Sequence, residues 1–423
     1  MLSKRISRVG VAMVAVIALA LLVVASGSSA TRAGTPTAAS KTAATTIIVW
    51  ADSVQTPAIK QSGQAWGASK GVTVTVAQHS FGGIRDDLKT VKPENAPDII
   101  IGPHDWVGDL ATNGLIEPLY PKAATKKQFP KYALDAFSYG TAVKKLYGAP
   151  YGLENVGLVV NTKLAKIPTS FAQLESEALA FKHKKSGNLA IAVPQGSGGD
   201  AYHMYPFFSG LGGYVFGRNK AGNLDPSNIG IANKSFLNHS ALIDKWNKEG
   251  LINSKVDYNT AKNAFLKQQA AFWITGPWES DTLKGSGLKF KIIQLPKIVF
   301  PSVPFLGVQG MMVTKYATDH SVDALAKDFV SNYMMTPAAQ LALANDNGRQ
   351  PANTVAAKKY SDPILSQFGR AGVGGVPMPN IPQMGSVWSE LGGAWVKSTQ
   401  GAGATKARIA FTTAARNIAN KIG

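Results

Sequence analysis

The chain has 423 residues, of which 45% are hydrophobic, carries a formal net charge of +19 and contains no cysteine. This length predicts two domains or two lobes, the apolar content excludes a disordered protein, and the missing cysteine excludes disulfides and a lipid-modified cysteine. The basic residues are scattered, and runs such as KHKK (182–185) interleave no aromatic residue, so we expect attraction to an anionic envelope and no nucleic-acid partner.

The first 30 residues are typical of a secretory signal peptide. MLSKRISR is basic, VGVAMVAVIALALLVVA is an apolar run that is short for a membrane span, and SGSSA ends in small residues. Cleavage is expected after Ala30, and an uncleaved anchor helix is the alternative. Residues 31–45 have no apolar period and predict a disordered spacer. The protein is therefore expected at the extracellular or cell-envelope face, without lipid on a cysteine.

Strand and helix patterns alternate in the next hundred residues. TTIIVWA (45–51), VTVTVAQ (72–78) and PDIIIGP (97–103) have the patterns of strands, and a helical stretch with Trp66 lies between the first two. Strand, helix, strand in this order predicts an α/β layer with a parallel sheet.

The later segments continue both patterns. Strands are expected at GLVVN (157–161), NLAIAVP (188–194), KFKIIQLP (289–296) and MMVTK (311–315), and helices at 170–184, 320–335 and 405–422. We expect the chain to cross several times between an N-terminal lobe (46–153 and 303–347) and a C-terminal lobe (154–302 and 348–423). Two facing α/β lobes form a cleft that hinge motion can close around a ligand.

The segment MPNIPQMGSVW (378–388) has an unusual composition. Pro379 and Pro382 exclude a helix interior and a central strand, yet the segment carries Met378, Ile381 and Trp388. One interpretation is that it only packs beneath a C-terminal helix. The other is that a stiff loop holds Trp388 at a ligand site, so that less entropy is lost on binding.

Three motifs occur in order: APDIIIGPHDWVGDLATNGLIEPL (96–119), KNAFLKQQAAFWITGPWES (262–280) and MPNIPQM followed by Trp388. Together they resemble the maltose/maltodextrin-binding proteins of bacterial ABC importers (extracellular solute-binding protein family 1), in their Gram-positive type. The resemblance covers about Thr46 to the C-terminus. It implies an α/β, two-lobe periplasmic-binding-protein fold of type II with hinged lobes and multiple chain crossings. It also implies that the lobes close on a malto-oligosaccharide and deliver it to the transmembrane subunits of an ABC permease.

The resemblance implies a set of polar ligand-binding residues. Asp105 falls on a sugar-binding aspartate, although an aspartate here could also cap a helix. Glu154 falls on the carboxylate beside the first lobe crossing. Asp200 and Tyr202 fall on a Glu-x-Tyr pair of the family.

Three tryptophans complete the expected site. Trp278 and Trp388 fall on two tryptophans that stack on sugar rings in the family, although Trp278 could also be a core residue. Trp106 stands where the best-known member has an arginine, and it could instead cover a helix start.

Other positions depart from the family pattern. That member has a tryptophan at the place of Gly102 and an arginine at the place of Gly392, and its N-terminal Asp-Lys pair is replaced by something like Asp52, Ser53 and Val54. Gln268 stands where the family usually has glycine. The sugar and its chain length therefore stay open.

The residue types suit sugar recognition, because aromatic rings cover C–H faces and carboxylates accept hydroxyls in the ring plane. Six histidines without zinc spacing and a QGSGGD loop without Gly-Lys-Ser/Thr predict neither a metal nor a nucleotide cofactor. We expect a monomeric binding protein and no enzyme. The alternatives are another oligosaccharide, an anionic ligand, a sensor or adhesion module, and a secreted glycoside hydrolase using Asp105 and Glu154.

Overall fold

The computed structural model describes residues 45–140 and 143–423. Residues 44–423 form one compact unit. The expected signal peptide lies outside the described residues, and so does the expected spacer except Thr45. Because all the described sheets and cores belong to the 44–423 unit, we expect this unit to fold without the preceding residues.

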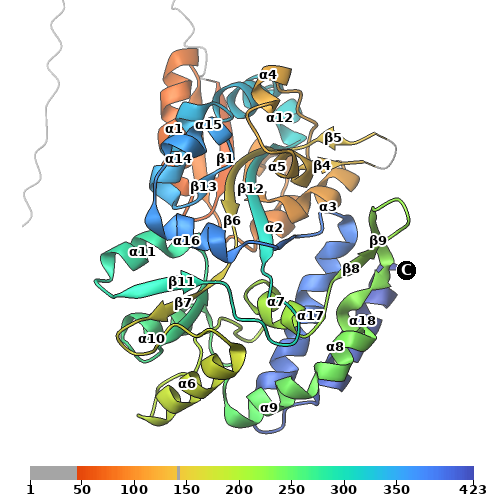
Figure 1. Cartoon of the computed structure of the whole chain (residues 1–423). Coiled ribbons are helices and arrows are strands. Elements are labelled where there is room, and N and C mark those ends of the chain that lie inside the picture. Colours follow the sequence, from red (N-terminus) through yellow and green to blue (C-terminus); the bar gives the residue numbers. More distant parts are fainter. Residues whose placement is uncertain (1–44, 141–142) are drawn as a thin grey trace, which may run out of the picture. The chain divides into compact units, whose positions relative to one another are not determined.

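A seven-stranded sheet forms the N-terminal lobe, in the order β13-β6-β12-β3-β1-β2 with β14 added beside β12 (Figure 1). Strands β1, β2 and β3 are parallel, as expected, but β12 is antiparallel to both β3 and β6. The sheet is therefore mixed. Its strands are β1 Thr46–Ala51, β2 Thr73–Gln78, β3 Ile99–Pro103, β6 Ala149–Glu154, β12 Phe305–Val313, β13 Gln350–Pro351 and β14 Val376–Pro377.

A three-stranded antiparallel sheet forms the C-terminal lobe, in the order β10-β7-β11. The strand expected at 188–194 is absent. This segment lies beside β10 but joins it only at two bridges, Leu189–Ala270 and Ala192–Trp273, so its apolar pattern reflects burial and not a continuous ladder. The strands of the three-stranded sheet and of two short hairpins are β7 Gly157–Asn161, β10 Phe272–Thr275 and β11 Phe290–Ile293, β4 Ser138–Tyr139 with β5 Lys145–Leu146, and β8 Phe216–Arg218 with β9 Leu224–Ile229.

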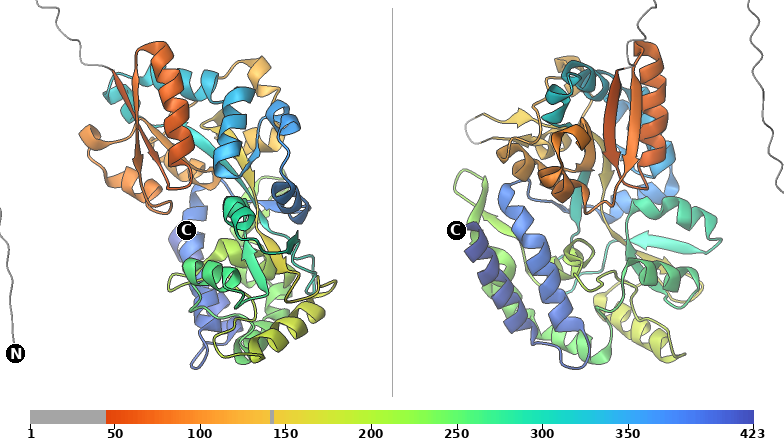
Figure 2. Two further views of the ribbon diagram at one scale, coloured as in Figure 1. Left: turned by 90° about the vertical axis from the view of Figure 1, so that its left-hand side faces the viewer. Right: turned by 180° about the vertical axis from the view of Figure 1, so that it is seen from behind.

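Helices flank both sheets, and α17 and α18 run side by side in the C-terminal lobe (Figure 2). The helix expected at 320–335 is split, because α13 is followed by a π-helical turn at Phe329–Tyr333. The helices are α1 Thr56–Lys70, α2 Ile84–Thr90, α3 Val107–Thr112, α4 Ala123–Lys126, α5 Lys131–Ala136, α6 Phe171–His183, α7 Ala201–Gly210, α8 Lys234–His239, α9 Ala241–Glu249, α10 Tyr258–Leu266, α11 Ser280–Gly285, α12 Tyr316–Asp319, α13 Asp323–Asp328, α14 Pro337–Asn347, α15 Thr354–Lys359, α16 Pro363–Ala371, α17 Gly385–Thr399 and α18 Ala407–Ile422.

Each lobe has its own hydrophobic cores. In the N-terminal lobe, one core surrounds Trp66 and Phe329, and another surrounds Trp106 and Phe137. In the C-terminal lobe, the largest core contains Trp395 on α17 together with residues of α7, α9 and α18. Separate cores on the two sheets make the molecule two-lobed, and the crossing segments lie between them.

The last lobe crossing is best placed after α15. Strand β13 pairs with β6, and Ala352 is buried in an N-terminal core, whereas Phe368 of α16 is buried in a C-terminal core. We therefore propose that the N-terminal lobe extends to about position 360, beyond the boundary at 347 that the sequence suggested.

The segment 378–388 is only partly the loop that its prolines predict. Residues 378–381 belong to no helix or strand, a 3-10 turn follows at Pro382–Met384, and α17 begins at Gly385, so Trp388 lies in the first turn of a helix. The Asn380 side-chain amide donates to the carbonyls of Ala136 and Ser138 at 2.9 and 3.0 Å. The part before this turn is therefore fixed to the N-terminal lobe through Asn380, while Trp388 belongs to the helical layer of the other lobe.

Candidate functional site

Asp105 joins the two lobes at the carboxyl end of β3. It lies in the 3-10 turn His104–Trp106 and is 5% exposed, and its Oδ2 accepts a hydrogen bond from Trp388 Nε1 at 3.0 Å. Its other oxygen, Oδ1, is buried without a hydrogen bond. Burial raises the pKa of Asp105 to about 6. Two of the expected site residues, Asp105 and Trp388, are therefore hydrogen-bonded to each other. Asp105 Oδ1 remains available to accept a further hydrogen bond.

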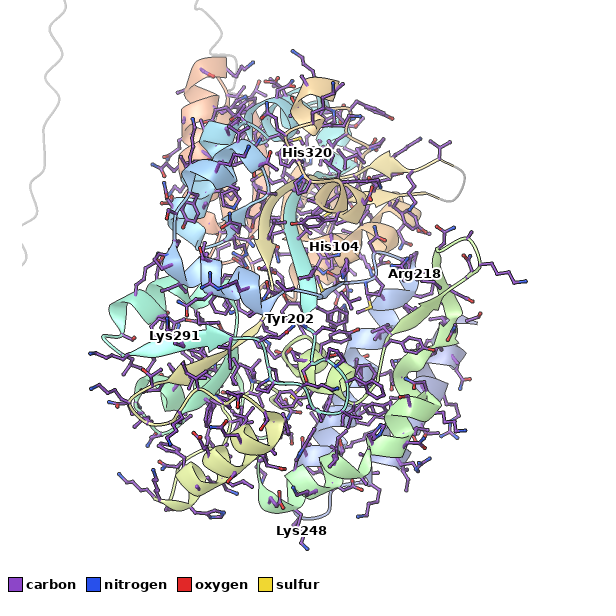
Figure 3. The ribbon with its side chains drawn as sticks, viewed as in Figure 1. His104, Tyr202, Arg218, Lys248, Lys291 and His320 are labelled. Atoms are coloured by element: carbon purple, nitrogen blue, oxygen red, sulfur yellow. The ribbon has the colours of Figure 1, made fainter. Side chains whose placement is uncertain are left out.

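His104 fixes the segment that leads to Trp388. The Val308 N–H donates to its Nδ1 at 3.1 Å, so its Nε2 carries the proton and donates to the Met378 carbonyl at 3.0 Å. Burial lowers the pKa of His104 to about 4, and this suits the neutral ring that both hydrogen bonds require. In Figure 3, His104 lies at the lower edge of the N-terminal lobe, above Tyr202 of the other lobe. Sequence reasoning missed this positioning role.

The shifted pKa values of His104 and Asp105 have opposite effects on how the stability of the protein changes with pH. Unfolded His104 binds a proton near pH 6.5 and native His104 only near pH 4, so acidification over this window costs stability. Native Asp105 binds a proton near pH 6 and the unfolded group only near 3.8, so the same acidification adds stability. We expect Asp105→Asn to lose stability between pH 6 and 4 more steeply than wild type, by up to roughly 1.4 kcal/mol per pH unit.

The measurement is urea unfolding at pH 7, 6, 5 and 4.5. His104→Gln is the matched variant, and its free energy of unfolding should fall less steeply than that of wild type over the same range. Equal slopes in wild type and Asp105→Asn would contradict the raised pKa of Asp105.

Two tryptophan rings lie over glycines. A Cβ on Gly102 would stand 2.2 Å from the Trp106 ring, and one on Gly276 would stand 2.2 Å from the Trp278 ring. The ring of Trp106 therefore occupies the space that a side chain at position 102 would take. Trp106 is 5% exposed and packs on Phe81, with ring centroids 5.7 Å apart.

The other aromatic residues form a continuous wall along the C-terminal lobe, completed by Phe305 at the start of β12. Tyr202 contacts Trp278 and Phe305, with centroids 6.1 and 6.2 Å apart, and Phe305 contacts Trp388 at 5.8 Å. Trp278 and Trp388 are both half-buried, so each keeps part of its ring surface available. Phe305, at the start of β12, was not predicted from the sequence.

Hydrogen bonds hold Trp278 in the wall. Its Nε1 donates to the Tyr258 hydroxyl at 2.7 Å, and this hydroxyl donates to Glu279. Lys262 pairs with the same carboxylate at 2.8 Å. The ring is therefore oriented before any ligand arrives, which reduces the entropy lost on binding.

Glu154 lies at the end of β6 in a buried ion pair. Its Oε2 accepts from Arg349 Nε at 2.6 Å, and its Oε1 accepts from Gln309 Nε2 at 2.7 Å. Glu154 and Arg349 are 8% and 4% exposed. Burial alone would lower the pKa of Arg349, but the facing Glu154 carboxylate keeps it raised. Nothing in the motifs pointed to Arg349, and its only sequence signal is a lone arginine before a short strand.

Further polar residues surround this ion pair. Asp52, just after β1, is buried, and burial raises its pKa, with Arg349 opposing that rise. A Cβ on Gly307 would lie 2.8 Å from Glu154 Cγ and 3.3 Å from the Tyr202 hydroxyl, so β12 brings Glu154 and Tyr202 together. The cluster thus continues from the N-terminal sheet to the aromatic wall.

The Asp200 carboxylate makes its hydrogen bonds within the protein, to His203. Its Oδ1 accepts from the His203 backbone at 3.0 Å, which caps α7, and its Oδ2 contacts His203 Nδ1 at 2.7 Å. Both oxygens are therefore occupied within one helical turn. His203 in turn packs on Trp278, with ring centroids 5.6 Å apart. Asp200 therefore orients His203, and His203 supports the Trp278 ring.

Several buried polar atoms of the residues around the Glu154–Arg349 pair and the aromatic wall make no hydrogen bond. Buried polar groups are normally paired, so a cluster of such atoms indicates a place for a polar ligand or water. These atoms are Asp105 Oδ1, Tyr202 Oη, Gln309 Oε1 and Arg349 Nη1. Within residues 45–140 and 143–423 no group of three His, Cys, Asp or Glu side chains is arranged to hold a metal ion.

Known proteins provide an independent comparison. The family model described as bacterial extracellular solute-binding protein matches residues 61–366. A galactooligosaccharide-binding protein of Bacillus subtilis (strain 168) is 28% identical over 365 residues, which cover 81% of this chain and 82% of the relative. A maltodextrin-binding protein of the same strain is 29% identical over 319 residues, or 70% of each chain. A maltooligosaccharide ABC transporter solute-binding lipoprotein of Streptococcus pneumoniae (serotype 4, strain ATCC BAA-334 / TIGR4) is 25% identical over 385 residues, covering 87% of this chain and 86% of the relative.

Proposed function

This chain belongs to the bacterial extracellular solute-binding protein family, and we propose that it binds a neutral oligosaccharide of the maltodextrin type between its lobes. The observation that carries the proposal is the Asp105–Trp388 hydrogen bond, which joins the lobes where an aromatic wall meets unpaired polar atoms. Rings that cover C–H faces and acceptors at the ring edge are what a sugar requires. Asp105, Trp106, Glu154, Tyr202, Trp278 and Trp388 are the proposed binding residues, with Asp200 in a supporting role.

The charges near the site favour a neutral ligand. Two arginines lie there: Arg349 pairs with Glu154, and Arg85 is close enough to Asp105 to oppose the rise of its pKa. However, each of these cations already has a carboxylate partner, Glu154 for Arg349 and Asp86 for Arg85. An anionic ligand would find no surplus positive charge, whereas hydroxyl groups could pair with both signs.

The relatives leave two sugar classes open, because their names refer to malto-oligosaccharides and to galactooligosaccharides. We expect calorimetric titration of the 44–423 unit with maltotriose to give a dissociation constant in the micromolar range, about −8 kcal/mol. A β-galactooligosaccharide, sucrose and glucuronate are the parallel titrants. If only the galactooligosaccharide binds, the proposed binding site stands and the proposed sugar is wrong. If only glucuronate binds, the proposal of a neutral ligand is wrong.

A glycoside hydrolase is the second candidate, because the pKa of Asp105, raised to about 6, is a property of catalytic acids. Glu154, however, is occupied by Arg349 and Gln309, so it is poorly placed to act as the second carboxylate. The similar proteins described above are named as sugar-binding or solute-binding proteins. We expect no glucose or maltose after prolonged incubation with maltotetraose, and release of either sugar would revive the hydrolase.

The wider role follows from the family. We propose that the protein is exported by its N-terminal segment, works as a monomer at the outer face of the membrane and passes its sugar to the transmembrane subunits of an ABC permease. In the part of the chain that the structure describes, no helix is long and apolar enough to cross a membrane.

A further inference from the structure

Helices α4 and α5 and the β4–β5 hairpin lie in the same part of the N-terminal lobe (Figure 1), and these segments carry several exposed lysines. Six exposed lysines lie between positions 118 and 148, and Asp135 is the one acidic residue in that range. Asp135 pairs with Lys131, and the other five lysines make no ion pair within the described chain. The lysines are Lys122, Lys126, Lys127, Lys131, Lys144 and Lys145.

The same part of the lobe exposes large apolar side chains. Tyr120 and Val143 are 76% and 72% exposed, the two highest values among the large hydrophobic residues that the structure describes, and Tyr132 is 46% exposed. The bridge between Leu119 and Leu146 brings both ends of this part together. We call these nine side chains the basic corner: Tyr120, Lys122, Lys126, Lys127, Lys131, Tyr132, Val143, Lys144 and Lys145.

This combination suits the surface of an anionic bilayer. Lysines near such a surface are attracted to acidic headgroups, and tyrosine rings settle at the headgroup level. Exposed apolar side chains lose contact with water there, while lysine stems extend along the interface and keep their charges in water. Nucleic acid would also attract the lysines but would offer nothing to Val143, which carries no ring to stack on a base.

We propose that the basic corner docks the protein on an anionic phospholipid surface. The chain has no cysteine to carry a lipid, unlike its relative named a lipoprotein, so charge and interfacial side chains supply the attachment. None of the nine side chains belongs to the proposed sugar site. The inference therefore stands independently of which ligand the cleft binds.

The test is co-sedimentation of the 44–423 unit with phosphatidylglycerol vesicles, with phosphatidylcholine vesicles in parallel. Each lysine near an anionic surface contributes about fivefold in partitioning, so we expect the reversal of Lys122, Lys126, Lys127 and Lys144 to glutamate to weaken binding by about 100-fold or more. The interaction should also disappear at 1 M salt, where screening acts over about 3 Å.

The matched control reverses four exposed lysines of the C-terminal lobe: Lys163, Lys166, Lys185 and Lys291. Figure 3 shows Lys291 on β11, on the other lobe from the corner. This control changes the net charge equally and should retain most of the binding, and Tyr120→Ser with Val143→Ser should weaken it without changing the charge. Sugar titration and circular dichroism verify the fold of each variant.

Three results would overturn the proposal. They are no binding to phosphatidylglycerol at low salt, equal loss in both quadruple variants, and binding to a soluble polyphosphate without binding to vesicles. The second result would indicate a diffuse charge effect, and the third would assign an anionic polymer as the occupant.

Discussion

Replacing Arg349 by methionine is expected to lower the free energy of unfolding by about 3–5 kcal/mol. The substitution leaves Glu154 buried, with one of its two hydrogen bonds gone and no cation beside it. A charge held out of water without a partner is among the costliest defects in a folded protein. Urea unfolding at pH 7, followed by circular dichroism, measures the loss.

Two variants make this result specific. Glu154→Gln added to Arg349→Met removes the stranded charge and should recover a large part of the stability. Lys131→Met removes the exposed Lys131–Asp135 pair instead and should cost about 1 kcal/mol or less. A change below about 1 kcal/mol in Arg349→Met would show that the ion pair does not organise this end of the sheet.

Trp388→Ala should reduce sugar affinity by about 30-fold or more, which corresponds to about 2 kcal/mol. The substitution removes a half-buried ring and the N–H that orients Asp105. Trp388→Phe keeps an aromatic face but loses the donor, so its affinity should be intermediate. Calorimetric titration with maltotriose at pH 7.5 measures both effects.

Trp395 provides the control on the same helix. It is fully buried in the core of the C-terminal lobe, and Trp395→Phe should leave sugar affinity within about twofold while lowering stability. If Trp388→Ala binds the sugar as wild type does, the stacking role of the aromatic wall is wrong.

Six of the seven strands expected from local patterns are present, because burial and alternation are properties of single segments, but β6 and β10 were not expected. TTIIVWA became β1, VTVTVAQ became β2 and GLVVN became β7. The strand predicted at 188–194 was wrong, because the buried residues of this segment lie beside β10 without continuous hydrogen bonding. The mixed sheet was also missed, since β12 returns to the N-terminal lobe from a distant part of the chain.

The site depended more on contacts between distant segments. Family motifs pointed to Asp105 and Trp388 separately, but the hydrogen bond between them joins residues 283 positions apart. Arg349 was missed because its role depends on Glu154, which is 195 positions away. Such pairings depend on the folded sheet and leave no local pattern in the sequence.

Departures from the family pattern have local explanations. Gln268, where the family usually has glycine, adopts φ 58°, so the left-handed turn that favours glycine is retained with a glutamine. Gly102 leaves room for the Trp106 ring, since a Cβ at this position would collide with it. Sequence comparison alone could identify both changes but could not show what compensates for them.

A crystal structure of the 44–423 unit with maltotriose would test the central claim most directly. We predict sugar rings against Trp278 and Trp388, and hydroxyl groups paired with Asp105 Oδ1, Tyr202 Oη and Arg349 Nη1. Maltotriose bound elsewhere, for example in the groove of about 610 Å³ beside Pro379, Tyr132 and Tyr214, would contradict the assignment of the site.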